Sequence, residues 1–460
     1  MDSTPSVDSQ GVTLRIVIRL WWPLAASWLL MGFELPAVSA VMARLPHSTV
    51  SLAAYGGVVF PLALLIESPI IMLLSASTAL SRDWQSYRVV RRYMYLAGGA
   101  TTLFHALVAF TPLFDLVVGG LLHPPAEVLG PARLGLQIML PWTMSIAYRR
   151  TQQGVLIRAG RSRAVGIGTG IRLAANCVVL AVGYYVGHVP GIVVGTLAVA
   201  AGVMSEAVYA GFTVQAVLRD QVRRAAPQAV PLTMPAFLKF FLPLALTPLI
   251  LFLAMPIASA AVSRMPRALE CLAAFPVVSG LVFTLRSLGF AFNEVVVALL
   301  ERPGAVPALR RFAVGLALAT TGALTAVALT PLAHLWFSHI SALPPALGEL
   351  ARAGLGGALL MPAFSALQSL YQGTLVHVRS TRGITESVVA YLAVSSMLLA
   401  AGVVTQRFAG LPVAMAAMSV GTAAQVLWLR ARARPHLRGL QWKGPPAEVL
   451  PLFPAQAPDV

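Results

Sequence analysis

The sequence has little charge and few acidic residues. Only 11% of its 460 residues are charged, less than half of the roughly 25% typical of soluble domains. Hydrophobic residues make up 58% of the chain, and the mean hydropathy is +0.79. A soluble fold could not bury so much apolar surface, so the composition excludes an ordinary soluble domain and indicates an integral membrane protein.

Cysteine is almost absent, since the chain has only Cys177 and Cys271. Both fall in or beside apolar stretches, which excludes a disulfide framework and favours small side chains packed in the protein. The eight histidines are scattered, and no nucleophile constellation or phosphate-binding glycine loop is present. We therefore expect no enzyme activity, no cofactor and no metal site.

Apolar stretches of about 20 residues, the length that crosses a bilayer, recur along nearly the whole chain. Alternating polarity of the barrel type is missing, so we expect helices. The predicted fold class is an all-α integral membrane protein with twelve transmembrane helices, at residues 15–44, 48–80, 90–118, 131–158, 164–187, 189–218, 235–263, 268–300, 308–338, 347–377, 383–405 and 408–430.

The net charge of +17 could suggest a nucleic-acid partner, but the basic residues are concentrated in alternate loops. This asymmetry is the positive-inside pattern, which places both termini and the even-numbered loops in the cytoplasm and gives no reason to expect nucleic acid. Arginine outnumbers lysine 31 to 2, which favours a bacterial source and the inner membrane. The arginines assigned to the even-numbered loops are Arg82, Arg88, Arg91, Arg92, Arg158, Arg161, Arg163, Arg219, Arg223, Arg224, Arg302, Arg310, Arg311, Arg379 and Arg382.

The two ends of the chain differ from its apolar body. Residues 1–12 are polar and carry no signal-peptide pattern, so we expect a disordered N-terminus. Residues 431–460 form a basic and then proline-rich stretch, expected to be a cytoplasmic tail. Between them we predict an N-lobe at 13–219, a cytoplasmic linker at 220–234 and a C-lobe at 235–430.

The chain contains an internal repeat. The stretch "LPAVSAVMARLPHSTVSLAAY" at 35–55 returns as "MPIASAAVSRMPRALECLAAF" at 255–275, and "QGVLIRAGRSR" at 153–163 returns as "QGTLVHVRSTR" at 372–382. Six helices per copy is an even number, so both copies enter the membrane from the same side. Such parallel repeats are related by an axis along the membrane normal. We therefore expect two six-helix lobes that face each other across a central cleft.

Polar side chains near the middle of the bilayer are costly against lipid and mark functional sites. By depth and repeat position, the predicted cleft residues are Arg149, Gln153, Arg286, Gln368, Gln372 and Glu67. Possible ion-coupling residues are Glu34 and Glu294, and the predicted hinges are Pro36 and Pro256. The alternative is that some embedded charges form structural ion pairs within one lobe, for example Arg172 with Glu206.

The proline-bearing first helix followed by "LAAY", and "QGVLIRAGRSR" followed by "RLAAN", resemble the multidrug and toxic compound extrusion (MATE) branch of the multidrug/oligosaccharidyl-lipid/polysaccharide (MOP) exporter superfamily. Within that superfamily, "WWPLA", "SLAAYGGVVFPL" and "FHALVAFTPL" are more similar to the progressive ankylosis (ANK) proteins. The resemblance implies two lobes that rock to expose a central cavity to either side. An ANK-type relative would export small organic or phosphate-bearing anions.

Three functional hypotheses follow. The leading one is a secondary transporter that exports a small anion, with Arg149 and Arg286 as its oxyanion partners. The second is a MATE-type drug/cation antiporter coupled to protons or sodium through Glu34, Glu67 or Glu294. Many such antiporters carry an aspartate in helix one where this sequence has Ala40, so their usual cation site is not carried over. The third is a flippase for a lipid-linked precursor.

Overall fold

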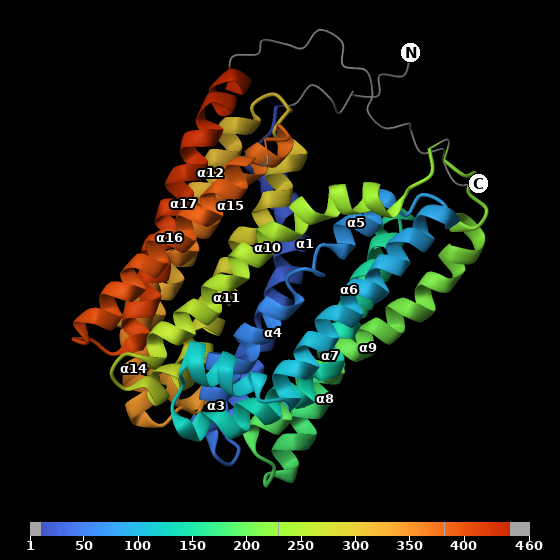
Figure 1. The fold of residues 1–460 in the computed structure, drawn as a ribbon. Helices are drawn as coiled ribbons and strands as arrows, with labels where there is room; N and C mark the ends of the chain where they lie inside the picture. The colour runs from blue at the N-terminus through green and yellow to red at the C-terminus, as the bar shows by residue number, and fades with distance from the viewer. Residues whose placement is uncertain (1–10, 229, 381, 442–460) are drawn as a thin grey trace.

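The computed structural model describes residues 11–228, 230–380 and 382–441, and every regular element in these ranges is helical (Figure 1). The elements of the N-terminal half are α1 (Leu14–Gly32), α2 (Glu34–Met42), α3 (Ser48–Ala54), η2 (Tyr55–Val59), α4 (Phe60–Glu67), α5 (Leu73–Leu80), α6 (Trp84–Phe110), η3 (Asp115–Leu122), α7 (Ala126–Arg158), α8 (Ser162–Val186), α9 (Gly191–Val217) and η4 (Leu218–Val222), where η marks a wider π-helical turn.

The C-terminal half repeats this order with fewer interruptions. Its elements are α10 (Met234–Ser263), α11 (Ala268–Leu299), α12 (Ala305–Leu329), α13 (Leu332–His334), η5 (Leu335–Ile340), α14 (Pro345–Ala358), α15 (Met361–His377), α16 (Arg382–Thr405) and α17 (Gly410–Gln441).

The membrane fold predicted from the sequence is confirmed. Eleven helical segments among the described residues are long and apolar enough to cross a bilayer. The 33-residue helix α7 is the remaining long helix and brings the count to the predicted twelve. It is less apolar than the others because it carries Arg133, Arg149 and Arg150.

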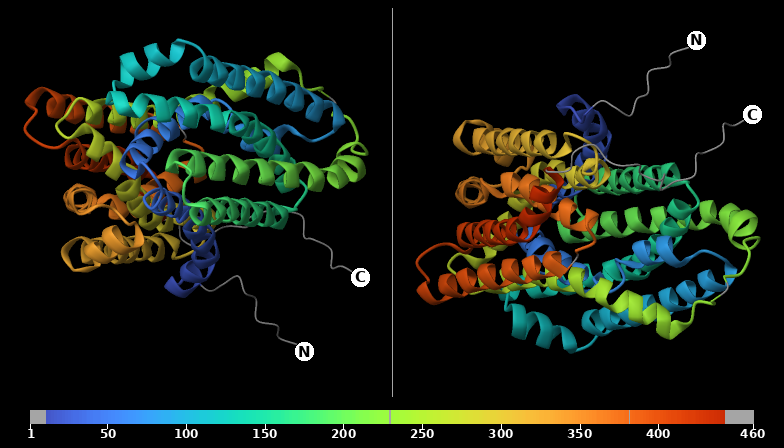
Figure 2. Two further views of the ribbon diagram at one scale, coloured as in Figure 1. Left: turned by 90° about the horizontal axis from the view of Figure 1, so that it is seen from below. Right: turned by 90° about the horizontal axis from the view of Figure 1, so that it is seen from above.

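The two halves form two groups of helices, shown in blue to green and in yellow to red in Figure 2. Their common origin is visible in the backbone, because left-handed residues recur 219 or 220 positions apart at four turns. A left-handed conformation is rare for residues other than glycine, so its recurrence at matching positions is strong evidence for a structural duplication. The four pairs are His47 and Arg267, His123 and Ala342, Gly160 and Arg379, and Gly187 and Gln406.

The two ends of the molecule differ. In Figure 1, α1 begins and α17 ends at the top, where the turn between α5 and α6 also lies. We call this the basic end, because Arg82 is in that turn and Arg88, Arg91 and Arg92 follow it in α6. At the opposite end the halves touch: a Cβ placed on Gly56 would lie 2.5 Å from the Pro276 ring, and one on Gly57 would lie 2.8 Å from Leu272. Only glycine permits this close approach of the wide turn η2 to α11.

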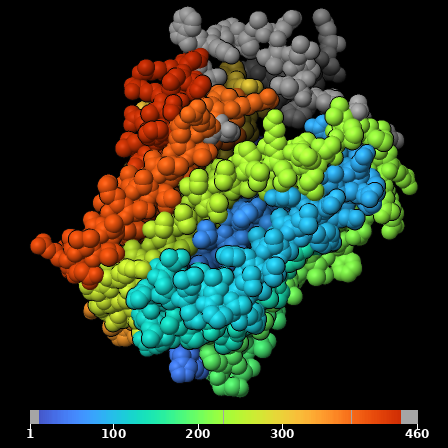
Figure 3. Space-filling model, viewed as in Figure 1, coloured from blue at the N-terminus to red at the C-terminus, as the bar shows by residue number. Residues whose placement is uncertain are grey.

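Toward the basic end the halves exchange their first helices. The start of α1 packs on α11 and α12 of the other half, and α10 packs on α4 and α6, where the tilted Tyr93 ring lies beside the rings of Phe237 and Phe241. In Figure 3, α10 crosses the front of the molecule, and the blue segment near the centre is set back between α10 and α6. The lobes are therefore linked by crossed helices rather than by a flat interface.

The first predicted helix is broken and the seventh is not. Helix α1 ends at Gly32 and α2 begins at Glu34. Pro36 has no N–H to donate to the Gly32 carbonyl, and the Thr284 hydroxyl of α11 donates to that oxygen instead, at 2.9 Å. Helix α10 continues through Pro256 to Ser263. The hinge roles of the two prolines stay predictions.

Other boundaries also differ from those predicted. The segment 48–80, predicted as one helix, divides into α3, η2, α4 and α5. At the N-terminus, predicted to be disordered to residue 12, the Val12 N–H donates to the Pro303 carbonyl at 2.8 Å. Helix α17 runs to Gln441, well into the predicted tail, because residues 431–441 continue its helical pattern. The rest of that tail, 442–460, lies outside the described residues.

Candidate functional site

A chain of buried charges runs through the middle of the N-terminal half. Its centre is Glu206 on α9, whose side chain is fully buried. Arg149 of α7 donates to one carboxylate oxygen at 2.5 Å, and Gln153, one turn further on, donates to the other at 2.8 Å. Arg172 of α8 lies 3.7 Å from the same carboxylate. A buried carboxylate needs such partners, because an isolated charge would be far too costly there.

The chain continues to the broken first helix. Arg172 forms an ion pair with Glu34 at 2.9 Å, and the Asn176 amide donates to the other Glu34 oxygen at 3.0 Å. Glu34 is the first residue of α2, immediately after the break. The network therefore ties α2 to α7, α8 and α9, and the structure forms the Arg172–Glu206 contact that we considered as a structural pair.

Glu67 and Arg150 belong to the same half but lie outside this network. Glu67, the last residue of α4, is only 3% exposed, and its Oε2 has no hydrogen-bond partner among the described residues. The positive charges that act on it most are Arg150 and Arg149. Neither arginine comes within 4 Å of it, and no ion pair among the described residues links it to Arg286.

Arg286 of α11 has no carboxylate partner. Its Nε donates to the Ser365 hydroxyl of α15 at 2.8 Å, and its guanidinium lies 5.3 Å from the Phe290 ring centre. Its two terminal nitrogens donate no hydrogen bond to a described residue. It lies thirteen residues before the end of α11, or about 20 Å from the basic end, which is deep in the bilayer.

The remaining predicted residues lie near Arg286 in sequence or on neighbouring helices. Gln368 and Gln372 of α15 are one turn apart, and the Gln368 amide donates to Gln372 at 3.4 Å rather than to a residue of the other half. The Gln368 carbonyl oxygen is buried without a partner in the part of the chain that the structure describes. Glu294 is exposed on α11 and forms no ion pair with a described residue.

The embedded charges are balanced in one half only. In the N-terminal half, the three embedded acids Glu34, Glu67 and Glu206 are matched in number by three embedded arginines, Arg149, Arg150 and Arg172. The C-terminal half contributes Arg286 and Glu294, but Glu294 lies eight residues away along α11, about 12 Å, and is exposed. Arg286 therefore has no nearby carboxylate to compensate its charge among the described residues.

Three residues that complete these contacts were not among the predicted site residues: Asn176, Ser365 and Tyr391. Tyr391 of α16 is buried beside Arg286. All three are uncharged and sit within apolar helices, so nothing in the sequence distinguishes them from packing residues. Ser365 gives the only available signal, since it lies on the Gln368 helix one turn earlier.

No protein-family model and no curated protein matches the chain. Among solved structures, it is similar to a multidrug resistance MATE family transporter of the MOP superfamily in an inward-facing conformation, with 13% identity and a TM-score of 0.68 over 91% of this chain and 99% of that chain. It is also similar to the lipid II flippase MurJ in an inward closed conformation, with 15% identity and a TM-score of 0.69 over 91% and 90%.

A third similar structure is a MOP superfamily transporter from Pyrococcus furiosus, described as having a binding pocket of reverse polarity that suggests a different function. It is 16% identical, with a TM-score of 0.60 over 95% of this chain and 100% of that chain. Identities this low establish the fold alone. The chain has the fold of MATE and MOP superfamily transporters, which confirms the predicted fold; the finer resemblance to ANK proteins stays a prediction.

Proposed function

We propose that this protein is a secondary active transporter that exports a small organic or phosphate-bearing anion by alternating access between its two lobes. The observation that carries the proposal is the uncompensated guanidinium of Arg286. Arginine binds oxyanions through paired hydrogen bonds, and two of the Arg286 nitrogens have no protein acceptor among the described residues. Gln368, on the helix that also supplies Ser365, is positioned to add a neutral donor.

The N-terminal network has a different part in this proposal. Arg149 and Gln153 both bind Glu206, so they hold α7 and α9 together, and binding of substrate by either would require that contact to loosen. Their predicted role in substrate binding therefore depends on a rearrangement during transport. The fold similarity to exporters and the ANK-like sequence features support export, from a bacterial inner membrane with both termini cytoplasmic.

A second candidate function rests on Glu67. A buried carboxylate with an oxygen that lacks a partner is a group that can take up a proton, which is what a drug/cation antiporter coupled to protons requires. Glu34 and Glu294 would be further coupling groups in that case. A lipid-linked precursor flippase, the activity named for MurJ, is the third alternative and would require a larger anionic substrate.

A thermal-shift screen of the purified chain tests the proposal. Anions that bind the folded protein raise its melting temperature in proportion to the logarithm of their concentration. We expect polyvalent organic or phosphate-bearing anions to stabilise the wild type, Arg286→Gln to abolish that effect, and Arg286→Lys to retain part of it. Stabilisation by cations, lost in Glu67→Gln and unaffected by Arg286→Gln, would instead favour the antiporter.

A further inference from the structure

A small cavity lies at the basic end of the N-terminal half, far from Arg286. Its volume is about 160 Å³, and its polar lining residues are Ser81, Arg82, Arg158 and Gln221. The cavity is formed where α7 ends, where α5 meets α6, and where η4 turns toward the linker. None of these residues takes part in the buried charge network or in the proposed transport site.

The two arginines converge on one point. The Ala79 carbonyl accepts a hydrogen bond from Arg82 Nε and another from Arg158 Nη1, each at 3.4 Å. Arg158 Nη1 also donates to the Thr78 carbonyl at 3.0 Å. These contacts use one nitrogen of each guanidinium and bring two positive charges close together. Like charges held this close repel one another unless an anion lies between them.

No carboxylate of the described residues neutralises the pair, since none forms an ion pair with either arginine. The nearest acid in sequence, Asp83, begins helix α6 and accepts hydrogen bonds from the Ser86 N–H at 2.8 Å and from the Gln228 amide at 3.0 Å. Its carboxylate is therefore already engaged. The residues that the structure describes therefore supply no counter-ion at this cavity.

The equivalent position in the C-terminal half contains a carboxylate that pairs with the basic side chain. With the repeat offset of 219, Thr78, Arg82 and Arg158 correspond to Val297, Glu301 and His377. His377 contacts the Val297 carbonyl through Nδ1 at 3.1 Å and Glu301 through Nε2 at 3.1 Å. The carbonyl contact is kept, but a histidine and a glutamate replace the two arginines. The C-terminal half therefore provides a comparison within the same protein, in which a glutamate partners the basic side chain.

We propose that Arg82 and Arg158, with Gln221, form a binding site for a small oxyanion, either a phosphate group or a carboxylate. Two guanidiniums supply charge-assisted donors, and the glutamine amide supplies a neutral one. The cavity volume of about 160 Å³ suits a phosphate or carboxylate group. The bound group comes either from a free anion or from the headgroup of an anionic lipid, which basic pockets on the cytoplasmic side of transmembrane helices bind.

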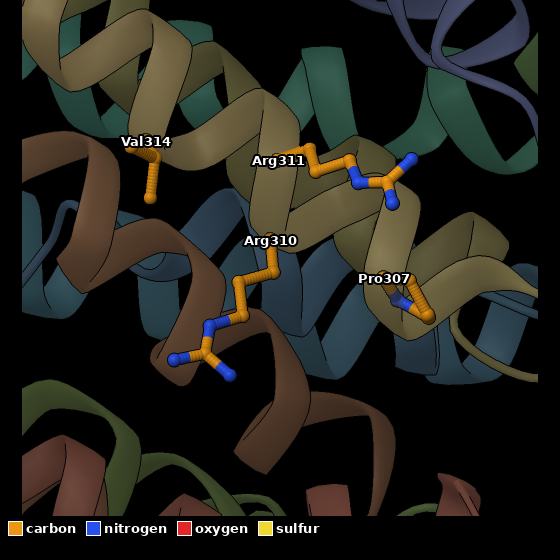
Figure 4. A pocket seen from close by; sticks show the side chains of 4 residues that line it. All are labelled: Pro307, Arg310, Arg311 and Val314. Atoms are coloured by element: carbon orange, nitrogen blue, oxygen red, sulfur yellow. The ribbon is translucent and has the colours of Figure 1, made fainter.

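A second arginine pair provides a matched control. A more open cavity on the surface of α12 is lined by Pro307, Arg310, Arg311 and Val314. Figure 4 shows the Arg310 and Arg311 side chains extending in different directions, so they do not converge on one anion. Arg310→Glu/Arg311→Gln removes the same three units of charge as Arg82→Glu/Arg158→His, with the histidine neutral, without touching the proposed site.

The test measures phosphate binding by the full chain in neutral detergent, by calorimetry and by thermal shift, in the Arg286→Gln background so that the proposed transport site does not contribute. The key variant is Arg82→Glu/Arg158→His, which installs the side chains found at the equivalent positions of the other half and is expected to fold. Chloride at equal ionic strength corrects for general screening. A parallel series uses nanodiscs of phosphatidylglycerol or phosphatidylcholine.

We expect phosphate to stabilise the parent, and its affinity to fall about tenfold or more in the double variant while Arg310→Glu/Arg311→Gln binds as the parent does. Stabilisation that appears only in phosphatidylglycerol, and is lost in the double variant, supports the site with a lipid as the source. An equal response in parent and double variant, or an equal loss in the control, overturns the proposal. If the double variant fails to fold, Arg82→Gln alone must weaken binding.

Discussion

Arg44 and Arg264 occupy equivalent positions 220 residues apart, and each binds backbone carbonyls of the opposite half. Arg44 donates to the His339 and Ile340 carbonyls at 2.6 and 2.9 Å, and Arg264 donates to the Leu121 and Leu122 carbonyls at 3.0 and 3.3 Å. Both arginines also bind a carbonyl one turn back in their own helix, each at 2.7 Å. The halves are thus held together at the end opposite the basic loops by two reciprocal contacts.

These contacts should set the balance between the two states of the proposed transporter. Opening this end breaks the two hydrogen bonds that each arginine makes to the opposite half, so Arg44→Ala/Arg264→Ala should favour the open form. At about 1 kcal/mol net for each of the four hydrogen bonds, the double variant should shift the ratio on the order of several hundredfold. Spin labels at His188 and Arg407, exposed and equivalent in the repeat, would measure the separation in a Cys177→Ser/Cys271→Ala background.

Arg352→Ala is the control for this experiment. Arg352 Nε donates to the Ala328 carbonyl at 3.0 Å within its own half, so its loss should leave the label distance unchanged. The same distance distribution in the double variant and the wild type would show that the reciprocal contacts do not hold the end closed.

Glu206 should be the most sensitive position for stability. Glu206→Ala leaves Arg149 and Arg172 buried without their shared carboxylate, and breaking a buried ion pair from one side costs about 3–5 kcal/mol. Glu206→Gln keeps an acceptor and should cost less. Thermal unfolding in detergent measures both, with Glu294→Gln as a control because Glu294 is exposed and unpaired among the described residues.

Removing the partner together with the acid should restore stability. Arg149→Met/Glu206→Leu replaces a charged pair by apolar side chains of similar size, which is often neutral or stabilising. The double variant should therefore unfold at a higher temperature than Glu206→Ala. If the double variant lost as much stability as the two single variants together, Arg149 would be held by contacts other than Glu206.

The contact between Thr284 and Gly32 predicts a coupling between two distant positions. Thr284→Val leaves the Gly32 carbonyl without its donor and should destabilise the protein by about 1 kcal/mol or more. In a Pro36→Ala background, residue 36 regains an N–H that can reach the same carbonyl, so Thr284→Val should cost less. Equal costs in both backgrounds, measured by thermal unfolding, would contradict this explanation of the helix break.

The fold could be predicted from the sequence because several separate sequence patterns indicate the same arrangement. Twelve apolar stretches of bilayer length, alternate basic loops and a repeat that aligns prolines and arginines all point to the same two-lobed arrangement. The depth of Arg149, Glu67 and Arg286 follows from helix geometry alone, since it depends only on the distance from the helix end.

The partners of these side chains could not be predicted in the same way. Repeat symmetry aligns Arg149 and Gln153 with Gln368 and Gln372, but Glu206 binds the first pair from within its own half, and residue spacing does not reveal which way a helix is rotated. The donor that satisfies the Gly32 carbonyl at the helix break is Thr284, which is more than 250 residues away. The match of Arg82 with Glu301 also needed the structure, because the repeat offset of 220 found at residues 35–55 would align Arg82 with Arg302, and the carbonyl contacts of Arg158 and His377 show an offset of 219 here.

Anion flux into proteoliposomes tests the central claim most directly. Purified protein would be reconstituted, a radiolabelled anion selected by the thermal-shift screen would be supplied on one side, and its exchange with unlabelled anion on the other side would be followed. The account predicts saturable exchange in the wild type, a loss of about tenfold or more in Arg286→Gln, and partial recovery in Arg286→Lys. Exchange at the wild-type rate in Arg286→Gln would contradict it.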